Sequence, residues 1–511
     1  MAQADYTPFT IPPGLVASAS MEDVPNRWWD GHMVRWIGPV LHPVGGNTKQ
    51  SVSGAFPFAS KVRAIHQWQD NSGVIWLGVL CELNVYVISG GTSTEITPTT
   101  FTGPPADLAQ GGYGDNTYSL NTYGTPRPNR PITRSIGPAW TLDNFGQILL
   151  VMSSYDGRLL SWDPSSAPGT KLAPVANAPV GNRTFIVTPE GFVVLYQYAG
   201  VPHQLGWCDQ GNITNWTPGI TSLAETAVIQ PASPIICARK TRYGTLFFTA
   251  RGSFFSRYLG TPYVYSVERV SDGDVPLSAA SLTSYGGVAI WPSEDNFYVF
   301  DGTNVSPINC DLLDYLKGSA DPIYVRYRGF GVNLLTQSEI WWGYPSVGQQ
   351  ECDRFIIYNF KDQWWSRAQQ IPRTCGFSGT YTSYPLFSDG SNIIEHENGN
   401  FFLDVGMPLP YISSGSLNFR DGGMITTLNK MVPNHGRSPA SVNYSFQSWL
   451  QRVDGTKVIN TVPPKAVDPD GLLRFSITGR DIQMMIQQAA NGVPPWKIGK
   501  MLMNVTARGK L

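Results

Sequence analysis

The sequence is short of charge of either sign. Lysine and arginine number 36 against 37 aspartates and glutamates, so the 511 residues carry a formal net charge of -1. Charged residues are 14% of the chain, whereas soluble domains carry about 25%. Binding to nucleic acid through a broad basic surface is therefore disfavoured, and much of the surface must be uncharged or covered by partners.

Long apolar runs are also missing. Runs such as 75–80 and 192–196 stop far short of the roughly 18 residues that a membrane-spanning helix needs. The first twenty residues have neither a basic start nor a continuous apolar stretch, so they do not resemble a secretory signal. We expect no membrane insertion.

Cysteine and histidine are few and scattered, which argues against metal sites and disulfide scaffolds. No Cys-x-x-Cys or His-Glu-x-x-His spacing occurs. We expect reduced cysteines packed as small hydrophobic residues, with no metal and no cofactor. The residues concerned are Cys81, Cys208, Cys237, Cys310, Cys352, Cys375, His32, His42, His66, His203, His396 and His435.

Catalytic motifs are missing as well. No Gly-x-Ser-x-Gly elbow, P-loop or Gly-x-Gly-x-x-Gly lies on a suitable strand-to-helix turn. Most acidic residues sit in turns, where the turn itself explains them: Asp156, Asp209, Asp301, Asp362 and Asp389. We expect no enzymatic activity and no catalytic residues.

Turn formers and aromatic residues are abundant. The chain has 52 Gly and 40 Pro, spread between apolar runs, and 16 Trp, 23 Tyr and 23 Phe. This pattern is typical of many turns that join many short strands. It does not indicate a linker or a collagen-like chain.

One phrase recurs between about residues 61 and 400. It consists of a short apolar strand, a turn, a second strand ending in an aromatic residue, and then Asp-Gly, Gly-Gly or Asn. Instances begin near residues 75, 148, 184, 245, 288 and 339. The segment 385–395 is either a further blade or the strand that closes the ring. Asp156-Gly157 is a hairpin signal in the second instance.

The repeat of near fifty residues favours a β-propeller, whose four-stranded blades take about 40 to 50 residues each. Blades stack on both faces, which accounts for continuous apolar strands. We predict an all-β fold with about six blades and a smaller β-rich C-terminal domain. A β-sandwich pair and a β-solenoid are the alternatives.

The expected organisation has three parts. Residues 1–60 form an N-terminal arm or platform segment, 61–400 the propeller, and 401–511 a C-terminal β-rich platform or tip domain. The Pro/Gly-rich stretch at about 98–131 is an insertion loop. In the last part we expect strands at 443–446, 473–477 and 501–505, and one short helix at 481–490.

Several phrases resemble tail-hub, or nozzle, proteins of short-tailed bacteriophages. The opening has IPPGLV at 11–16, NRWWDGHMVRW at 26–36 and PVGG at 43–46. Similar mid-propeller, late-blade and C-terminal phrases are LGWCD at 205–209 with TNW at 214–216, YNFKDQWW at 358–365, and TGR at 478–480 with WKIG at 496–499. The insertion has no counterpart in this comparison.

The resemblance implies a structural podovirus tail protein in the virion, made in the cytoplasm of a host bacterium. In that family a homo-hexamer of propeller subunits forms a ring below the portal and its adaptor ring. Tail fibres or tailspikes attach outside, a tail needle or plug closes the lumen, and DNA passes through the centre at ejection without being held.

The composition is compatible with such a ring. A near-neutral tube gives passing DNA few cations to bind. Low charge and many aromatics also suit permanent subunit interfaces. Candidate interface residues are Trp28, Trp29, Arg35, Trp36, Trp364 and Trp365. For the first four, an interface or clamp near the tail axis competes with ordinary core in which the arginine stacks on tryptophan.

A second functional hypothesis stays open. The chain could be a carbohydrate-binding or depolymerising β-propeller, in which aspartate and aromatic pairs line a sugar groove. Glycan release by a monomer would favour this hypothesis. A salt-resistant hexamer that docks onto the portal-adaptor complex would favour the tail hub.

Overall fold

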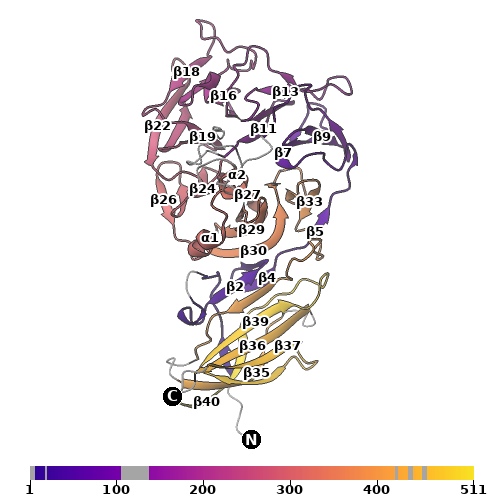
Figure 1. Ribbon diagram of the computed structural model, residues 1–511, viewed down its shortest axis with the longest axis vertical. Helices are drawn as coiled ribbons and strands as arrows, with labels where there is room; N and C mark the ends of the chain where they lie inside the picture. The colour runs from indigo at the N-terminus through magenta and orange to yellow at the C-terminus, as the bar shows by residue number, and fades with distance from the viewer. Residues whose placement is uncertain are drawn as a thin grey trace, which may run out of the picture.

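The computed structural model describes residues 6–17, 20–104, 137–419, 424–435, 441–451 and 457–510. A ring of small sheets stands above an elongated pair of sheets, and strand β40 lies at the far end of that pair (Figure 1). Helices are short in the described residues: α1 (Leu313–Ser319), α2 (Tyr324–Arg328), η1 (Met21–Asp23), η2 (Tyr198–Gly200) and η3 (Leu335–Gln337).

The ring is a β-propeller, which confirms the predicted fold class. Its innermost strands contact one another in turn, β7, β11, β15, β19, β23, β27 and β31, and β31 contacts β7 to close the circle. The structure therefore has seven blades, not about six. The sequence showed only part of the seventh, because its strands β31 to β33 are completed by β5 from the N-terminal arm.

Blades 1 to 4 are built in chain order, each antiparallel from its innermost to its outermost strand, with β6 added beside β10 in blade 1. Blade 1 has β6 (Ser53–Gly54), β7 (Val62–Gln69), β8 (Ile75–Cys81), β9 (Val85–Ser89) and β10 (Thr92–Glu95), and blade 2 has β11 (Trp140–Phe145), β12 (Ile148–Ser153), β13 (Leu160–Trp162) and β14 (Ala173–Pro174). Blade 3 has β15 (Thr184–Val187), β16 (Val193–Tyr196), β17 (Gln204–Trp207) and β18 (Glu225–Val228), and blade 4 has β19 (Ile235–Thr241), β20 (Gly244–Thr249), β21 (Gly252–Tyr258) and β22 (Tyr265–Asp272).

Blades 5 to 7 continue this order until the N-terminal arm supplies the last strand. Blade 5 has β23 (Thr283–Tyr285), β24 (Val288–Pro292), β25 (Phe297–Phe300) and β26 (Val305–Ile308). Blade 6 has β27 (Phe330–Leu334), β28 (Glu339–Tyr344), β29 (Cys352–Asn359) and β30 (Trp364–Arg373). Blade 7 has β31 (Cys375–Phe377), β32 (Leu386–Ser388), β33 (Ile393–His396) and β5 (Asn47–Lys49).

Strand β12 shows why the blade strands are apolar throughout. Leu149 and Val151 pack into the core shared with blade 1, whereas Leu150 and Met152 pack into the core shared with blade 3. Alternate side chains of a strand point to opposite faces, and here both faces are buried. The predicted hairpin at Asp156-Gly157 connects β12 to β13, as expected.

The lower part consists of two sheets. One is β2 (Trp28–His32), β34 (Tyr411–Ser414), β39 (Asp481–Gln488), β36 (Val442–Gln451) and β37 (Lys457–Lys465); the other is β1 (Tyr6–Phe9), β40 (Met501–Lys510), β35 (Met424–Val432) and β38 (Leu473–Gly479). Phe446 and Phe475 stack between the sheets with ring centroids 4.0 Å apart. We call this part the two-sheet unit.

The N-terminal arm runs through both parts of the molecule. It contributes β1 and β2 to the two-sheet unit, then the hairpin β3 (Val34–Ile37) and β4 (Val40–Pro43), and then β5 and β6 to the propeller. Strands β2 and β3 lie against β30 of blade 6. The arm therefore ties the two-sheet unit to the side of the propeller (Figure 1).

The helix expected at 481–490 is wrong, because this segment is strand β39. Ile482, Met484 and Ile486 are fully buried while the residues between them are partly exposed, so the burial follows a period of two. The strand lies between β34 and β36, where both of its edges are hydrogen-bonded. The strands expected at 443–446, 473–477 and 501–505 are confirmed.

The predicted insertion loop at about 98–131 lies, from residue 105 onward, outside the described residues. In the parts of the chain that the structure describes, no helix is both long and apolar enough to cross a membrane.

Candidate functional site

Four of the six candidate interface residues lie inside the junction between the propeller and the two-sheet unit. Trp28 is 3% exposed, Trp36 2%, Trp364 3% and Trp365 3%. A side chain buried in its own chain cannot contact a neighbouring subunit, so the interface prediction is wrong for these tryptophans. Trp29 on β2 is partly exposed, and its role stays a prediction.

These tryptophans are core residues because the arm packs on the outermost strand of blade 6. Trp36 of β3 meets Trp364 of β30 edge to face, with ring centroids 5.2 Å apart. Trp365 packs on Phe297 of blade 5 at 4.7 Å. The backbone follows the same course, since the amide of Leu15 donates to the carbonyl of Trp365 over 2.8 Å.

Arg35, the fifth candidate, is also buried, and it pairs with carboxylates. Its Nε lies 2.9 Å from Glu339 Oε1 of β28, and its Nη2 donates to Glu397, which follows blade 7. Trp341 Nε1 also donates to Glu339, over 2.9 Å. Arg35 thus joins the arm to blades 6 and 7, which is a structural role and not an exposed interface.

The two glutamates respond differently to this environment. Burial raises the pKa of Glu339, despite the nearby charge of Arg35. Burial would also raise the pKa of Glu397, but the charge of Arg35 and hydrogen bonds from Arg35 and the Gly45 amide lower it below its usual value. One arginine therefore holds two carboxyl groups of unequal acidity.

Further charged pairs cross the junction. Arg373 at the end of β30 donates to both carboxylate oxygens of Asp404 over 2.8 Å, and Asn47 of the arm donates to the same group over 2.9 Å. Arg367 pairs with Asp30 of β2. Such buried pairs are sensitive to loss of one partner, because the other charge stays buried.

A second buried ion network lies where the innermost strands begin. Arg63 Nη2 lies 2.8 Å from Glu82 Oε1 and 2.7 Å from Glu351 Oε1, and Arg328 Nη1 lies 2.8 Å from Glu82 Oε1. Burial would raise the pKa of Glu351, but Arg63 and Arg328 lower it to about 2. Arg328 ends α2, so this network bridges blades 6 and 1 at one mouth of the channel.

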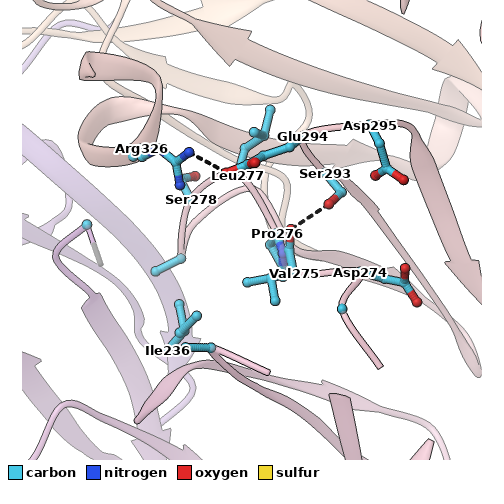
Figure 2. A pocket seen from close by; sticks show the side chains of 14 residues that line it. Ile236, Asp274, Val275, Pro276, Leu277, Ser278, Ser293, Glu294, Asp295 and Arg326 are labelled. Carbon is cyan, nitrogen blue, oxygen red and sulfur yellow. Dashed lines mark hydrogen bonds and ion pairs between the residues drawn. The ribbon is translucent and has the colours of Figure 1, made fainter. Parts of the chain in front are cut away.

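A hollow of 380 Å³ opens at the same mouth, between blades 4 and 5 and helix α2 (Figure 2). Its wall combines apolar side chains such as Ile236 and Val275 with a polar rim. On the rim Glu294 pairs with Arg326, and Ser293 Oγ donates to the Val275 carbonyl over 2.8 Å. The hollow can hold a small polar ligand.

Two more carboxylates belong to that rim. Tyr298 donates its hydroxyl to Asp295 over 2.8 Å, and burial together with Asp295 and Asp274 raises the pKa of Tyr298. Sequence reasoning missed this hollow, because Asp274 and Asp295 stand in connections between strands, where acidic residues are expected for turn geometry alone. Only the packing of α2 beside blades 4 and 5 makes a cavity there.

The channel itself is lined by the innermost strands. On its wall His66 Nε2 lies 2.8 Å from Asn144 Oδ1, and Lys240 Nζ lies 3.4 Å from Asp143 Oδ2. Burial lowers the pKa of His66, so the imidazole is neutral at pH 7. Arg239 on β19 also lines the channel, and its side chain is exposed.

Metal ligands do not gather in the described residues: no group of three or more His, Cys, Asp or Glu side chains among them could hold a metal ion. All six cysteines are free and buried. Burial raises the pKa of each thiol, which keeps it protonated at neutral pH.

Comparisons with known proteins bear on the fold alone. No protein-family model matches the chain, and no curated protein matches its sequence. Among solved structures it is similar to catalytically inactive virginiamycin B lyase from Staphylococcus aureus with quinupristin, at 8% identity and TM-score 0.39, covering 70% of this chain and 98% of that one.

Two further similar structures have different names and sources. YCF48 from Cyanidioschyzon merolae is 9% identical, with TM-score 0.38 and coverage of 69% and 98%. The β-propeller domain of Cps50 (Swd1) from Myceliophteria thermophila is 9% identical, with TM-score 0.37 and coverage of 69% and 99%. What this chain has in common with these proteins is the β-propeller architecture.

Proposed function

We propose that this chain is a non-enzymatic structural subunit of a short-tailed phage tail. Six copies form the nozzle or hub ring below the portal and adaptor, in the virion. The ring conducts DNA at ejection and anchors tail fibres or tailspikes, and a needle or plug closes it. The resemblance of the sequence phrases at 11–16, 26–36 and 43–46 to tail-hub proteins motivates the proposal.

One observation carries it: these phrases are the segments that join the two parts of the chain. Leu15 bonds to β30, Trp36 packs on Trp364, Arg35 pairs across the junction, and the Gly46 amide donates to the Gly399 carbonyl over 2.8 Å. A tail subunit under load from packaged DNA needs its propeller and platform to move as one body. A junction with a shared hydrophobic core and matched buried charges supplies that stiffness.

The residues at the mouth of the propeller channel bear on where the DNA passes. Arg328 connects α2 to Glu82 of blade 1 across the mouth, with Nη1 2.8 Å from Oε1. The propeller's own channel is therefore no conduit, and we assign DNA passage to the axis of the ring of subunits. A net charge of -1 leaves each subunit with no excess of cations to retain phosphates.

Ring assembly requires surface that is apolar in the isolated chain. Beside the junction, Val405 is 103% exposed, Phe401 55% and Ile37 61%. Clusters of large apolar side chains that are exposed to water are typical of surfaces that a partner protein covers. These residues replace the buried tryptophans as our candidates for subunit contact.

The experiment is light scattering and negative-stain imaging of the purified chain, alone and with a portal-adaptor complex. We expect a hexamer that resists salt and docks onto the adaptor. Val405→Asp should weaken the ring, whereas Ile459→Asp, a change at a 53% exposed residue on the far strand β37, should not. A monomer that stays monodisperse in the presence of the adaptor would overturn the proposal.

The second candidate function is a carbohydrate-binding or depolymerising propeller, and the observation that favours it is the polar rim of the hollow. Asp274 and Asp295 beside the apolar wall give the hollow the mixed apolar and polar lining of a small-ligand site, although no aromatic side chain of the described residues lines it. Release of reducing sugar from host capsule or lipopolysaccharide, lost in Asp295→Asn, would support it. Absence of release together with hexamer formation would exclude it in favour of the tail hub.

A further inference from the structure

The sequence contains two Asn-Gly pairs, Asn398-Gly399 and Asn491-Gly492. Asparagine is thermally labile, and it is most labile before glycine, because the amide nitrogen of a residue without Cβ meets little steric hindrance when it attacks the asparagine side chain. Both glycines have the left-handed conformation, with φ of +83° at Gly399 and +80° at Gly492. The conformation of the glycine therefore does not distinguish the two pairs, and the difference lies in what holds each asparagine.

The side chain of Asn491 is fixed at both atoms of its amide. Its Oδ1 accepts from the Phe402 amide over 2.8 Å, and its Nδ2 donates to the Phe402 carbonyl over 2.9 Å. The ring of Phe401 also limits the space beside Gly492, where an added Cβ would lie 3.4 Å from Cδ2. The Asn491 side chain cannot turn toward the Gly492 nitrogen unless both hydrogen bonds break.

Asn398 stands in the turn that follows β33, and its side chain is held at one atom alone. Its Nδ2 donates to Glu395 Oε2 over 2.7 Å, whereas Oδ1 has no hydrogen-bond partner among the described residues. Gly399 is exposed to solvent, and a Cβ added there would meet no atom within 4 Å. The Asn398 amide can therefore turn, and water reaches the pair.

We propose that Asn398 is a site of spontaneous deamidation and that this conversion loosens the closure of blade 7. The Gly399 nitrogen gives its proton to hydroxide and attacks Cγ of Asn398, which closes a succinimide ring. The bond from Cγ to Nδ2 breaks, and the nitrogen leaves as ammonia with a proton from water. Water then opens the ring to aspartate or isoaspartate. This inference concerns the chain itself and does not rest on the tail-hub proposal.

Both products change the contacts that hold the N-terminal arm at blade 7. In each, a carboxylate replaces the amide that donates to Glu395, so two negative charges face each other. The Asn398 carbonyl accepts from Thr48 Oγ1 over 3.2 Å, and the Gly399 carbonyl accepts from the Gly46 amide over 2.8 Å. Isoaspartate turns the first carbonyl into a free carboxylate and adds a carbon to the main chain before the second. The two acceptors then no longer match the arm.

Peptide mass mapping of the full-length chain, kept in its native state at mildly alkaline pH, tests the chemistry. We expect the Asn398 peptide to convert at least about tenfold faster than the Asn491 peptide, because two hydrogen bonds must break first at Asn491. In urea the two sites should convert at similar rates, since neither is held. No conversion of Asn398 in the native chain, or equal native rates at the two sites, would overturn the proposal.

The effect on blade 7 is tested by variants that do not depend on the reaction. Asn398→Asp should lower the Tm by about 1–3 °C, because the new carboxylate faces Glu395. Adding Glu395→Gln should restore the Tm. Asn400→Asp is the matched control, since it makes the same change of charge at an exposed residue of the same turn and should leave the Tm unchanged. Equal shifts in Asn398→Asp and Asn400→Asp would contradict the role given to Glu395.

Thermal melts of the incubated chain join the two tests. The converted wild type should melt below the fresh protein. Asn398→Gln, incubated in parallel, should keep its Tm, because glutamine closes the corresponding larger ring far more slowly. A chain that is converted at Asn398 and still melts at the Tm of the fresh protein would overturn the loosening of blade 7.

Discussion

The indole of Trp36 lies edge-on against the indole of Trp364, with ring centroids 5.2 Å apart. One ring comes from the N-terminal arm and the other from the outermost strand of blade 6, so the contact joins segments more than three hundred residues apart in the chain. Both rings are nearly inaccessible to water.

Replacing Trp36 with alanine should lower the free energy of unfolding by about 3–5 kcal/mol, the cost of an aromatic cavity in a core. Tyr263→Ala, at a residue that is 75% exposed, should change it by less than about 0.5 kcal/mol. Urea unfolding followed by tryptophan fluorescence measures both. Equal effects of the two substitutions would contradict the placement of Trp36 in the junction core.

Arg35→Met should destabilise the chain by about 3–5 kcal/mol, because two buried carboxyl groups lose their cation. Adding Glu339→Gln to this variant should restore part of the loss. The control is Lys49→Met, since Lys49 is 56% exposed and its Nζ lies 4.0 Å from Asp389. An exposed pair of this kind contributes at most about 1 kcal/mol. A larger loss at Lys49 than at Arg35 would contradict the assignment.

Acidification should weaken the junction through two buried histidines. Burial lowers the pKa of His32 to about 3 and of His396 to about 4, below the ordinary 6.5. Their neutral forms are favoured in the folded state, so this stability is complete above pH 6.5 and is lost as the pH falls toward the folded values.

Each histidine should contribute a slope of about 1.4 kcal/mol per pH unit below 6.5. His396→Gln should remove one such slope from a plot of unfolding free energy against pH, and the His32→Gln, His396→Gln double variant should remove both. Glu397, Asp404, Arg35 and Arg373 also act on His396. Measurements above pH 5 keep the two carboxylates ionised. An unchanged slope in both variants would show that neither histidine is responsible.

Gly46→Ala should impair closure of blade 7. A Cβ there would lie 2.4 Å from the Phe401 carbonyl oxygen and 2.5 Å from its amide nitrogen, and both are backbone atoms that cannot move aside. We expect a loss of about 1–3 kcal/mol from this overpacking. Gly318→Ala, where nothing lies within 4 Å in helix α1, should stabilise slightly. Thermal melts of the two variants give the comparison.

The six thiols should resist a thiol reagent in the native state. All are buried, and burial raises their pKa, so neither access nor thiolate is available. We expect fewer than about one reactive thiol per chain natively and all six after unfolding. A native count of several thiols would indicate that the blades open on the time scale of the reaction.

The repeat could be predicted from the sequence because each blade carries the same local information. Strands such as β12 are apolar on both faces, and turns such as Asp156-Gly157 mark where they end. The seventh blade could not be counted in the same way. Its fourth strand, β5, is a three-residue polar segment, Asn-Thr-Lys, that becomes a strand only by pairing with β33.

The candidate interface residues show what could not be predicted from local sequence. The tryptophans at 28, 36, 364 and 365 were recognisable as important, but whether they face a partner or their own core depends on how the arm crosses β30. That arrangement is a tertiary contact without a local sequence signal. In β39 a signal did exist, since Ile482, Met484 and Ile486 alternate with polar or half-exposed residues. The absence of Gly and Pro favoured a helix there, and the central position in a sheet outweighed it.

The closing pairings also determine the order in which the molecule can be made. Asn47 of β5 pairs with His396 of β33, and Tyr6 of β1 pairs with Asn504 of β40. Neither N-terminal strand can form its sheet before its partner strand has been synthesised. A ribosome releases the N-terminal arm long before either partner strand has been synthesised. Strands β1 and β5 of the arm must therefore stay unpaired until these partners have been made, and the propeller can close only after more than three quarters of the chain, through residue 396 of 511, is complete. Premature termination anywhere before β33 yields an open ring with apolar blade faces exposed, a product suited to degradation and not to assembly.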